Sequence, residues 1–313
     1  MFFSYRQQSQ GFTVLARCLP LEAVPEPTLL GFGISSLFSH FRPVNKSVKP
    51  GVQMASKTSK PIIQDKHPSG TPIVKEELKL PKCFSSKLAF MLYNVFSKEE
   101  CDALIKHTQK MGYEEALVNV GFGRQTKMTD VRNNERCIWD TFDESGKIFN
   151  RIRPYLPPVW KHRKLLALNE RLRVLYYQPG QYFKPHFDGE YRRPNGERSF
   201  ITIQIYLNEG FKGGETTFMN SPDKELCPVV PKTGSVLVFQ HDILHEGSTL
   251  IAGEKYTIRT DVMYSAAQID PKEESALLEA SKALLNDNDS AGHPTEDQDI
   301  QSCVNEVENL DIK

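Results

Sequence analysis

His186 and Asp188 stand two residues apart in a stretch whose composition is typical of a β-strand. Alternate residues of a strand point to the same face, so an imidazole nitrogen and a carboxylate oxygen would be presented to one point. This donor pair suits a divalent transition metal and leaves room for a third ligand from elsewhere in the chain. On its own a His-x-Asp pair does not define a metal site, because polar pairs on a surface or in a core also arise by chance.

The eight histidines of the sequence offer few candidates for that third ligand. Outside the predicted strands lie His40, His67, His107, His162 and His293. His241 and His245 both follow the apolar run 236–239, and His241 would more easily point outward because it directly follows the strand. Gly247 lets the backbone after His245 turn close to a metal. We therefore prefer His245, which completes the two-histidine, one-carboxylate ligand set of Fe(II) oxygenases, with open positions for a keto acid and O₂.

A second group of residues could bind a keto-acid co-substrate. Lys255 begins the last predicted strand and shares a face with Thr257 and Arg259. If this face turns inward, the lysine could bind the distal carboxylate of 2-oxoglutarate; the alternative is that both cations face solvent. Tyr177 and Tyr206 could donate phenol hydrogen bonds to the same carboxylate, or pack as core aromatics.

These residues need an ordered core to position them, and we expect it over residues 84–265. The predicted strands are 88–96, 172–178, 182–187, 199–207, 215–219, 235–240 and 255–264, separated by Pro-Gly, Asn-Gly and Gly-Gly turn signals. A capping box at Ser97 and Glu100 predicts a helix that ends before Gly112, and further helices are expected over 140–155 and 271–285. Helices followed by short, regularly spaced strands indicate an α+β chain with a mainly β core.

Bulk composition excludes several classes. Lysine plus arginine equals aspartate plus glutamate at 39 each, so no net charge attracts the chain to nucleic acid. The six cysteines form no C-x-x-C pair, and no apolar run is long enough to span a membrane. We expect an intracellular soluble protein, cytoplasmic or nuclear, with mitochondrial import as the alternative. Residues 1–80 are expected to be a disordered or targeting segment, and 286–313 an acidic disordered tail following a terminal helix over 266–285.

Several ordered motifs resemble the prolyl 4-hydroxylase-type 2-oxoglutarate/Fe(II) dioxygenases. They are Tyr177-x-Pro-Gly-Gln-x-Phe-x-Pro-His186-Phe-Asp188, Tyr206-Leu-Asn208, Gly213-Gly-Glu-Thr216, Gly234-Ser-Val-Leu-Val-Phe239 leading to His245, and Gly253-Glu-Lys255-Tyr256. The resemblance implies a double-stranded β-helix (jelly roll) flanked by helices. It also implies His186, Asp188 and His245 as iron ligands, Lys255 on the distal carboxylate of 2-oxoglutarate, and Tyr177 and Tyr206 as its hydrogen-bond partners. Arg259 could take the place of Lys255 or pair with Asp261.

The resemblance implies hydroxylation of a C–H bond, with peptidyl proline as the favoured substrate. Its cofactors and co-substrates would be Fe(II), 2-oxoglutarate and O₂, with ascorbate as reductant and with succinate and CO₂ released. A protein or peptide substrate is preferred over a small molecule, and no nucleic acid or membrane partner is expected; the oligomeric state is not predicted. A non-catalytic metal- or partner-binding jelly roll is the alternative from another class.

Two segments are candidates for the substrate rim. They are 132–136, with sequence Arg-Asn-Asn-Glu-Arg, and the loop 189–198. Arg192, Arg193 and Arg198 of this loop could attract an acidic peptide, or they could simply be solvated charges.

Overall fold

The computed structural model describes residues 62–64, 71–119, 124–221 and 224–290 of the 313-residue chain. Within these residues the helices are α1 (Lys98–Met111), α2 (Phe142–Ile152) and α3 (Pro271–Ser290), with 3₁₀ turns at Lys82–Phe84 and Arg153–Tyr155. The strands are β1 (Val74–Glu77), β2 (Ala89–Tyr93), β3 (Glu114–Glu115), β4 (Val118–Asn119), β5 (Gln125–Thr126), β6 (Glu135–Asp140), β7 (Val159–Trp160), β8 (Arg163–Leu168), β9 (Arg171–Tyr177), β10 (Phe183–His186), β11 (Arg198–Tyr206), β12 (Lys212–Gly213), β13 (Thr216–Ser221), β14 (Lys224–Val229), β15 (Val236–Gln240), β16 (His245–Gly247), β17 (Leu250–Ala252) and β18 (Lys255–Tyr264).

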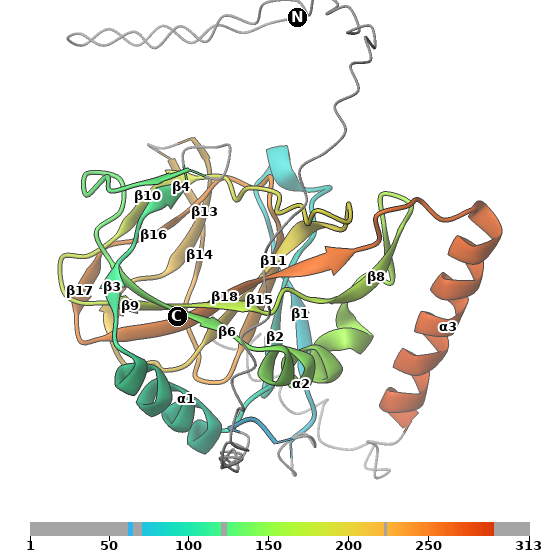
Figure 1. Cartoon of the computed structure of the whole chain (residues 1–313), viewed down its shortest axis with the longest axis horizontal. Coiled ribbons are helices and arrows are strands. Elements are labelled where there is room, and N and C mark those ends of the chain that lie inside the picture. The colour runs from blue at the N-terminus through green and yellow to red at the C-terminus, as the bar shows by residue number, and fades with distance from the viewer. Residues whose placement is uncertain (1–61, 65–70, 120–123, 222–223, 291–313) are drawn as a thin grey trace, which may run out of the picture. The chain divides into compact units, whose positions relative to one another are not determined.

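Most strands belong to two antiparallel sheets (Figure 1). The major sheet has the order β1-β2-β15-β11-β18-β9-β6-β3, and the minor sheet has the order β10-β16-β13-β14. From β9 onward the chain alternates between them: β9, β11, β15 and β18 join the major sheet, while β10, the β13–β14 hairpin and β16 join the minor sheet. This alternation is the topology of a double-stranded β-helix, so the predicted jelly-roll core is confirmed.

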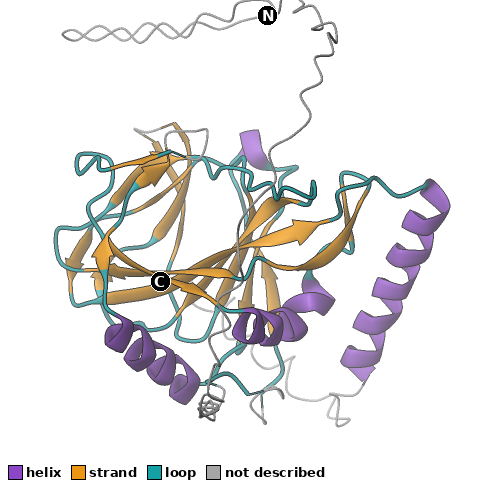
Figure 2. Ribbon diagram, viewed as in Figure 1, coloured by secondary structure: helices purple, strands orange, loops and turns teal. Residues whose placement is uncertain are grey.

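The central strand β11 shows how the sequence supports two buried faces. Ile201, Ile203 and Ile205 are fully buried in a cluster with residues of α1 and α2, which cover one face of the major sheet (Figure 2). The alternate residues of β11 point to the space between the two sheets, where Tyr206 packs in a second cluster with Phe218 of β13. Because both faces are covered, the strand is buried at almost every position, and only its polar alternate residues reveal the inner face.

Local signals define the start and end of α1, one of the two helices that cover this sheet. The Ser97 side chain accepts a hydrogen bond from the Glu100 backbone N–H, and the Glu100 carboxylate accepts one from the Ser97 backbone N–H. Gly112 follows the last turn at φ 88°, a conformation that glycine adopts without strain. The predicted start and end of this helix are therefore confirmed.

The structure corrects some sequence-based boundaries. Val74–Glu77 pairs with β2, and Ile63 is fully buried, so order begins inside the stretch expected to be disordered or targeting. The terminal helix α3 continues to Ser290, beyond the predicted end at 285. Residues 1–61 and 65–70, and residues 291–313 of the acidic tail, lie outside the described residues.

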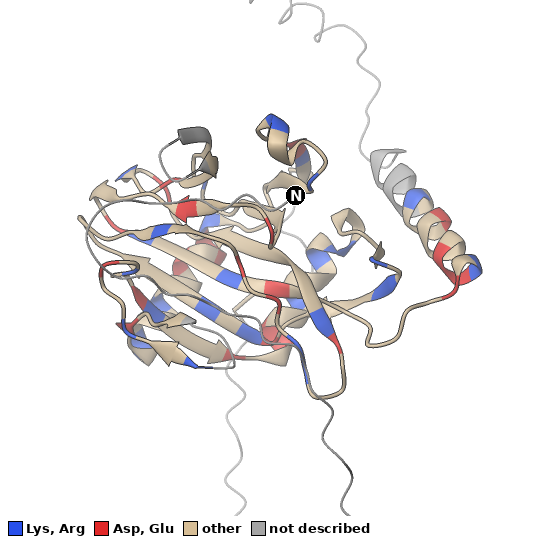
Figure 3. Ribbon diagram, turned by 90° about the horizontal axis from the view of Figure 1, so that it is seen from above, with Lys and Arg blue, Asp and Glu red and all other residues tan. Residues whose placement is uncertain are grey.

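The charged residues are mixed, as the equal numbers of basic and acidic residues lead one to expect. Figure 3 shows lysine, arginine, aspartate and glutamate intermixed along the strands and on α3. No helix within the described ranges is both long and apolar enough to cross a membrane.

Candidate functional site

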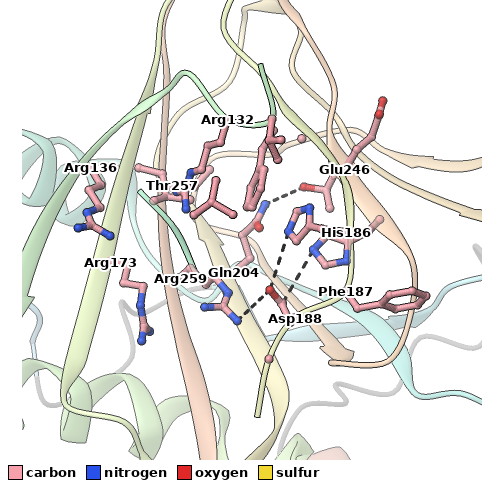
Figure 4. Close-up of a pocket in the computed structure, with 18 of the residues that line it drawn as sticks. Arg132, Arg136, Arg173, His186, Phe187, Asp188, Gln204, Glu246, Thr257 and Arg259 are labelled. Carbon is pink, nitrogen blue, oxygen red and sulfur yellow. Dashed lines mark hydrogen bonds and ion pairs between the residues drawn. The ribbon is translucent and has the colours of Figure 1, made fainter. Parts of the chain in front are cut away.

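A cavity of about 440 Å³ lies between the two sheets of the jelly roll. Its major-sheet wall is formed by inward-facing residues of β6, β9, β11 and β18, and its minor-sheet wall by β10 and β16. Figure 4 shows side chains from both walls pointing into this space.

The structure brings together the three residues predicted to hold a metal. His186 ends β10 and His245 begins β16, and the two residues are directly opposite in the antiparallel pairing of these strands. Asp188 lies beside them, with its carboxylate oxygens 3.9 Å from Nε2 of His186 and 3.8 Å from Nε2 of His245. One donor atom from each of the three residues lies within 4.8 Å of the others.

The prediction that His186 and Asp188 share one face of a strand is wrong. β10 ends at His186, so Asp188 does not share a strand face with it. The Asp188 backbone N–H instead donates to the carbonyl of His241 at 3.0 Å, which ties the turn after β10 to the end of β15. His241 itself is buried with Nε2 3.6 Å from Asp261, so the structure places His245 rather than His241 in the cluster.

Both cluster histidines are oriented by backbone carbonyls. Nδ1 of His186 lies 2.8 Å from the Lys184 carbonyl, and Nδ1 of His245 lies 3.0 Å from the Ile243 carbonyl. A carbonyl only accepts, so Nδ1 carries the hydrogen and the Nε2 lone pair is left to face the cluster. Burial lowers the pKa of His186 to about 3 and also lowers the pKa of His245, so both rings are neutral near pH 7.

Asp188 supplies the negative charge of the cluster. Its carboxylate accepts hydrogen bonds from Thr202 Oγ1 at 2.5 Å and from Arg259 Nη2 at 2.9 Å. Burial by itself would raise the pKa of this carboxyl, but the charge of Arg259, followed by the neighbouring histidines, outweighs burial and holds the pKa well below its ordinary value. Two neutral imidazoles and one ionised carboxylate are the donor set that fits Fe(II) with open coordination positions.

Lys255 lies inside the same cavity. Only 2% of its surface is exposed, which rules out the alternative that it faces solvent. Its Nζ donates to the Gly214 carbonyl at 2.5 Å and lies 4.9 Å from the centroid of the Tyr177 ring and 6.0 Å from that of Tyr206. Burial lowers the pKa of Lys255 to about 8, although the charge of Glu215 acts in the opposite direction.

The other predicted co-substrate residues have more varied contacts. Tyr177 is buried directly opposite Lys255 in the β9–β18 pairing and lines the cavity. Tyr206 is fully buried, and its hydroxyl donates to Thr216 Oγ1 at 2.8 Å. Arg259 contacts Asp261 at 3.2 Å in addition to Asp188, so the pairing anticipated as one of its two alternatives is present.

The three arginines of the 189–198 loop, predicted as possible peptide contacts, already have acidic partners. The ion pairs join Arg192 to Glu190 at 3.6 Å, Arg198 to Glu190 at 3.2 Å, and Arg193 to Glu197 at 3.0 Å, with Glu170 as a second partner of Arg193. Because the chain's own acids neutralise them, these arginines are poor candidates for attracting an acidic peptide.

Sequence reasoning missed Arg173, which lines the cavity, and the hydrogen bond from Thr202 to Asp188. The signal was present on β9, where Arg173 alternates with Leu175 and Tyr177 and so shares their inward face. This position does not by itself indicate a cavity residue, because an arginine in a strand is more often solvated.

Comparisons with known proteins find several to which this chain is similar. A sequence model of the 2OG-Fe(II) oxygenase superfamily matches residues 172–260, which include all three cluster residues. A probable prolyl 4-hydroxylase 3 of Arabidopsis thaliana is 28% identical over 202 residues, covering 54% of this chain and 67% of that protein. A probable prolyl 4-hydroxylase 11 of the same plant is 40% identical over 150 residues, covering 46% of this chain and 49% of that protein. A solved viral collagen prolyl hydroxylase from Paramecium bursaria Chlorella virus-1, in a 2OG complex, covers 54% of this chain and 92% of its own, with 22% identity and a TM-score of 0.39.

Proposed function

Since this chain belongs to the 2-oxoglutarate/Fe(II) oxygenase superfamily and resembles its prolyl 4-hydroxylases, we propose that it hydroxylates a peptidyl proline, using O₂ and 2-oxoglutarate and releasing succinate and CO₂. One observation carries the proposal: His186, Asp188 and His245 converge within 4.8 Å at the wall of a cavity that also holds the buried Lys255. A non-catalytic jelly roll is not favoured, because it would have no use for this combination.

The proposed roles follow from the contacts of each side chain. Nε2 of both histidines and the Asp188 carboxylate would hold Fe(II), which supplies C–H oxidation with 2-oxoglutarate and O₂ when bound. Thr202 and Arg259 fix the orientation of the Asp188 carboxylate. Ascorbate would be the reductant that keeps such a centre active.

Lys255 is the residue we assign to the distal carboxylate of 2-oxoglutarate. Its charge is buried and forms no ion pair among the described residues, with Glu215 acting on it only at longer range, so an incoming carboxylate would relieve the unfavourable burial. Arg259 is less suited to this role because Asp188 and Asp261 already neutralise it. Tyr177, beside Lys255 in the cavity, would complete the binding site as a phenol donor. The Tyr206 hydroxyl already donates to Thr216 Oγ1, so Tyr206 could serve as a second donor only by giving up that bond.

The substrate class is proposed from the relatives. Several are named prolyl 4-hydroxylases or probable prolyl 4-hydroxylases, which favours a proline in a protein or peptide over a small molecule. The exposed Phe187, at 58% exposure between two cluster residues, offers an apolar contact at the cavity for such a chain.

The test is formation of succinate from 2-oxoglutarate by the purified chain, loaded with Fe(II) without oxygen and then exposed to O₂ and ascorbate. Proline peptides should stimulate succinate formation and gain one oxygen atom, as measured by mass spectrometry. His245→Ala should abolish both signals. His162→Ala is the matched control, because His162 is 67% exposed and pairs with Glu274 away from the cavity. Absence of turnover in folded, iron-loaded protein with proline peptides, or equal turnover in His245→Ala, would contradict the proposal.

A further inference from the structure

Basic side chains cover much of the major-sheet wall of the cavity. Strand register explains why they share one face: Arg173 of β9 is opposite Arg259 of β18, while Arg136 of β6 is opposite Leu175 of β9. Arg132, just before β6, also lines the cavity. Figure 4 shows Arg132, Arg136 and Arg173 across the cavity from His186 and Asp188.

The acids of the cavity neutralise this wall unevenly. Arg173 and Arg259 both contact Asp261, at 3.3 Å and 3.2 Å, and Arg259 also contacts Asp188. Arg136 pairs with Glu114 at 3.2 Å, the one acidic contact it has within the described ranges. One aspartate is therefore shared between two arginines, and positive charge is left on the side of the wall nearest β6.

Among the described residues, Arg132 is the arginine of this wall that has no acidic partner. Its Nε donates to the Asn134 side-chain carbonyl at 2.7 Å, and its guanidinium lies 4.5 Å from the centroid of the Phe183 ring. Within the described part of the chain it forms no ion pair. Burial lowers the pKa of Arg132 to about 10, and the charges of Arg259 and Arg136 act in the same direction. The side chain is thus held in place and charged, with its terminal nitrogens free to donate.

We propose that Arg132, supported by Arg136 and Arg173, binds a carboxylate of the substrate, so that the preferred substrate is a peptide with an acidic residue close to the hydroxylated position. This inference rests on the proposed hydroxylase function and adds a specificity-determining residue to it. An Arg guanidinium can bind a carboxylate through two parallel hydrogen bonds, which gives both strength and orientation.

The two other anions of the reaction leave this site available. The distal carboxylate of 2-oxoglutarate is assigned to Lys255, and its keto-acid end belongs at the metal. The arginines of the 189–198 loop cannot provide the same recognition, because Glu190, Glu197 and Glu170 already pair with them. The charge of Arg132 is therefore less neutralised than the charges of the arginines in the 189–198 loop.

The test compares the binding of capped proline peptides that differ at one flanking position, with glutamate, glutamine or lysine placed in turn on either side of the proline. Fluorescence anisotropy is measured with the Fe(II)- and 2-oxoglutarate-loaded chain without oxygen, and succinate formation is measured separately. We expect glutamate at one position to bind about tenfold more tightly than glutamine, and the preference to weaken with added salt. Equal binding of all three peptides by a chain that forms succinate would overturn this inference and leave the hydroxylase proposal intact. Absence of succinate would instead contradict the hydroxylase proposal.

Two variants assign the preference to Arg132. Arg132→Gln should remove the preference for glutamate, and Arg132→Glu should reverse it toward the lysine peptide, a gain that misfolding could not produce. Arg171→Gln is the matched control: it removes an arginine from β9, but Arg171 pairs with Asp140 outside the cavity lining. A glutamate preference that survives in Arg132→Glu would show that another residue recognises the carboxylate.

Discussion

At the scale of single residues, the charge of Asp188 depends on its neighbours. Burial alone would favour the protonated carboxyl, yet Arg259 and the two histidines keep its pKa far below the ordinary value. The carboxylate therefore stays ionised over the whole range in which a protein is normally assayed. It can bind a cation without first losing a proton.

Asp188→Asn is expected to abolish tight metal binding while preserving the shape of the side chain. Residues that only hydrogen-bond to a ligand typically change metal affinity by about 10- to 100-fold when mutated, so loss of a ligand charge should exceed that range. Calorimetric titration with Mn(II) or Co(II) without oxygen measures the affinity. Asp140→Asn is the control, because Asp140 is exposed and pairs with Arg171. Unchanged affinity in Asp188→Asn would remove this residue from the proposed ligands.

Lys255 predicts a pH dependence for 2-oxoglutarate binding. Burial lowers its pKa from 10.5 to about 8, so the uncomplexed chain loses this charge as the pH rises through 8. Binding of a carboxylate favours the charged lysine and would raise its pKa again. The affinity should therefore be constant below about pH 8 and fall above it, by at most about tenfold per pH unit.

The measurement is the dissociation constant of 2-oxoglutarate, with Mn(II) in place of iron, between pH 6.5 and 9.5. Lys255→Met should bind weakly at every pH. Lys255→Arg should lose the dependence above pH 8, because an arginine remains charged. A wild-type affinity that does not change over this range would count against Lys255 as the partner of the distal carboxylate.

At the scale of elements, local signals were enough for the helices but not for every strand. The capping box at Ser97 and the glycine at 112 define α1 without reference to the rest of the chain. β6 was not predicted, since its sequence Glu-Arg-Cys-Ile-Trp-Asp has mixed polarity and its place depends on pairing with β9. The convergence of His186, Asp188 and His245 could be predicted because these residues belong to compact motifs. The arginine wall could not, since register across three strands brings Arg136, Arg173 and Arg259 together.

Glu100 couples α1 to its neighbours, and its loss should be more damaging than loss of the cap alone. Its carboxylate contacts Arg151 at 2.6 Å with both side chains nearly inaccessible, and it also accepts the Gln64 backbone N–H at 3.0 Å. Glu100→Gln removes the carboxylate charge from this buried ion pair and should lower the free energy of unfolding by roughly 3–5 kcal/mol. Ser97→Ala removes only one capping bond and should cost about 1 kcal/mol.

Urea unfolding followed by circular dichroism gives both values. Lys98→Ala provides the control, because Lys98 forms only an exposed pair with Asp102 on the same helix. Equal destabilisation by Glu100→Gln and Ser97→Ala would show that the contacts of Glu100 with Arg151 and Gln64 contribute little.

At the scale of the whole molecule, the proposed metal site connects parts that are distant in the sequence. His186 ends one strand of the minor sheet, Asp188 follows that strand, and His245 begins another strand, while Arg259 reaches Asp188 from the major sheet. Ligands that bind the folded chain but not the unfolded chain stabilise it by mass action. A metal at about 100 times its dissociation constant should thus add about 2.7 kcal/mol to the free energy of unfolding.

Metal removal should accordingly be visible as a change in thermal stability. For an ordered region of this size, 1 kcal/mol corresponds to roughly 2–4 °C, so saturating Mn(II) should raise the melting temperature by about 5–10 °C relative to protein treated with a chelator. His245→Ala should lose this increase, whereas His162→Ala should keep it, since His162 lies outside the cavity. Differential scanning fluorimetry with and without the chelator measures each case. Because the increase reports binding and not turnover, its presence in the wild type and its absence in His245→Ala would support the ligand assignment even if the peptide substrate were still unidentified; an equal increase in both would contradict it.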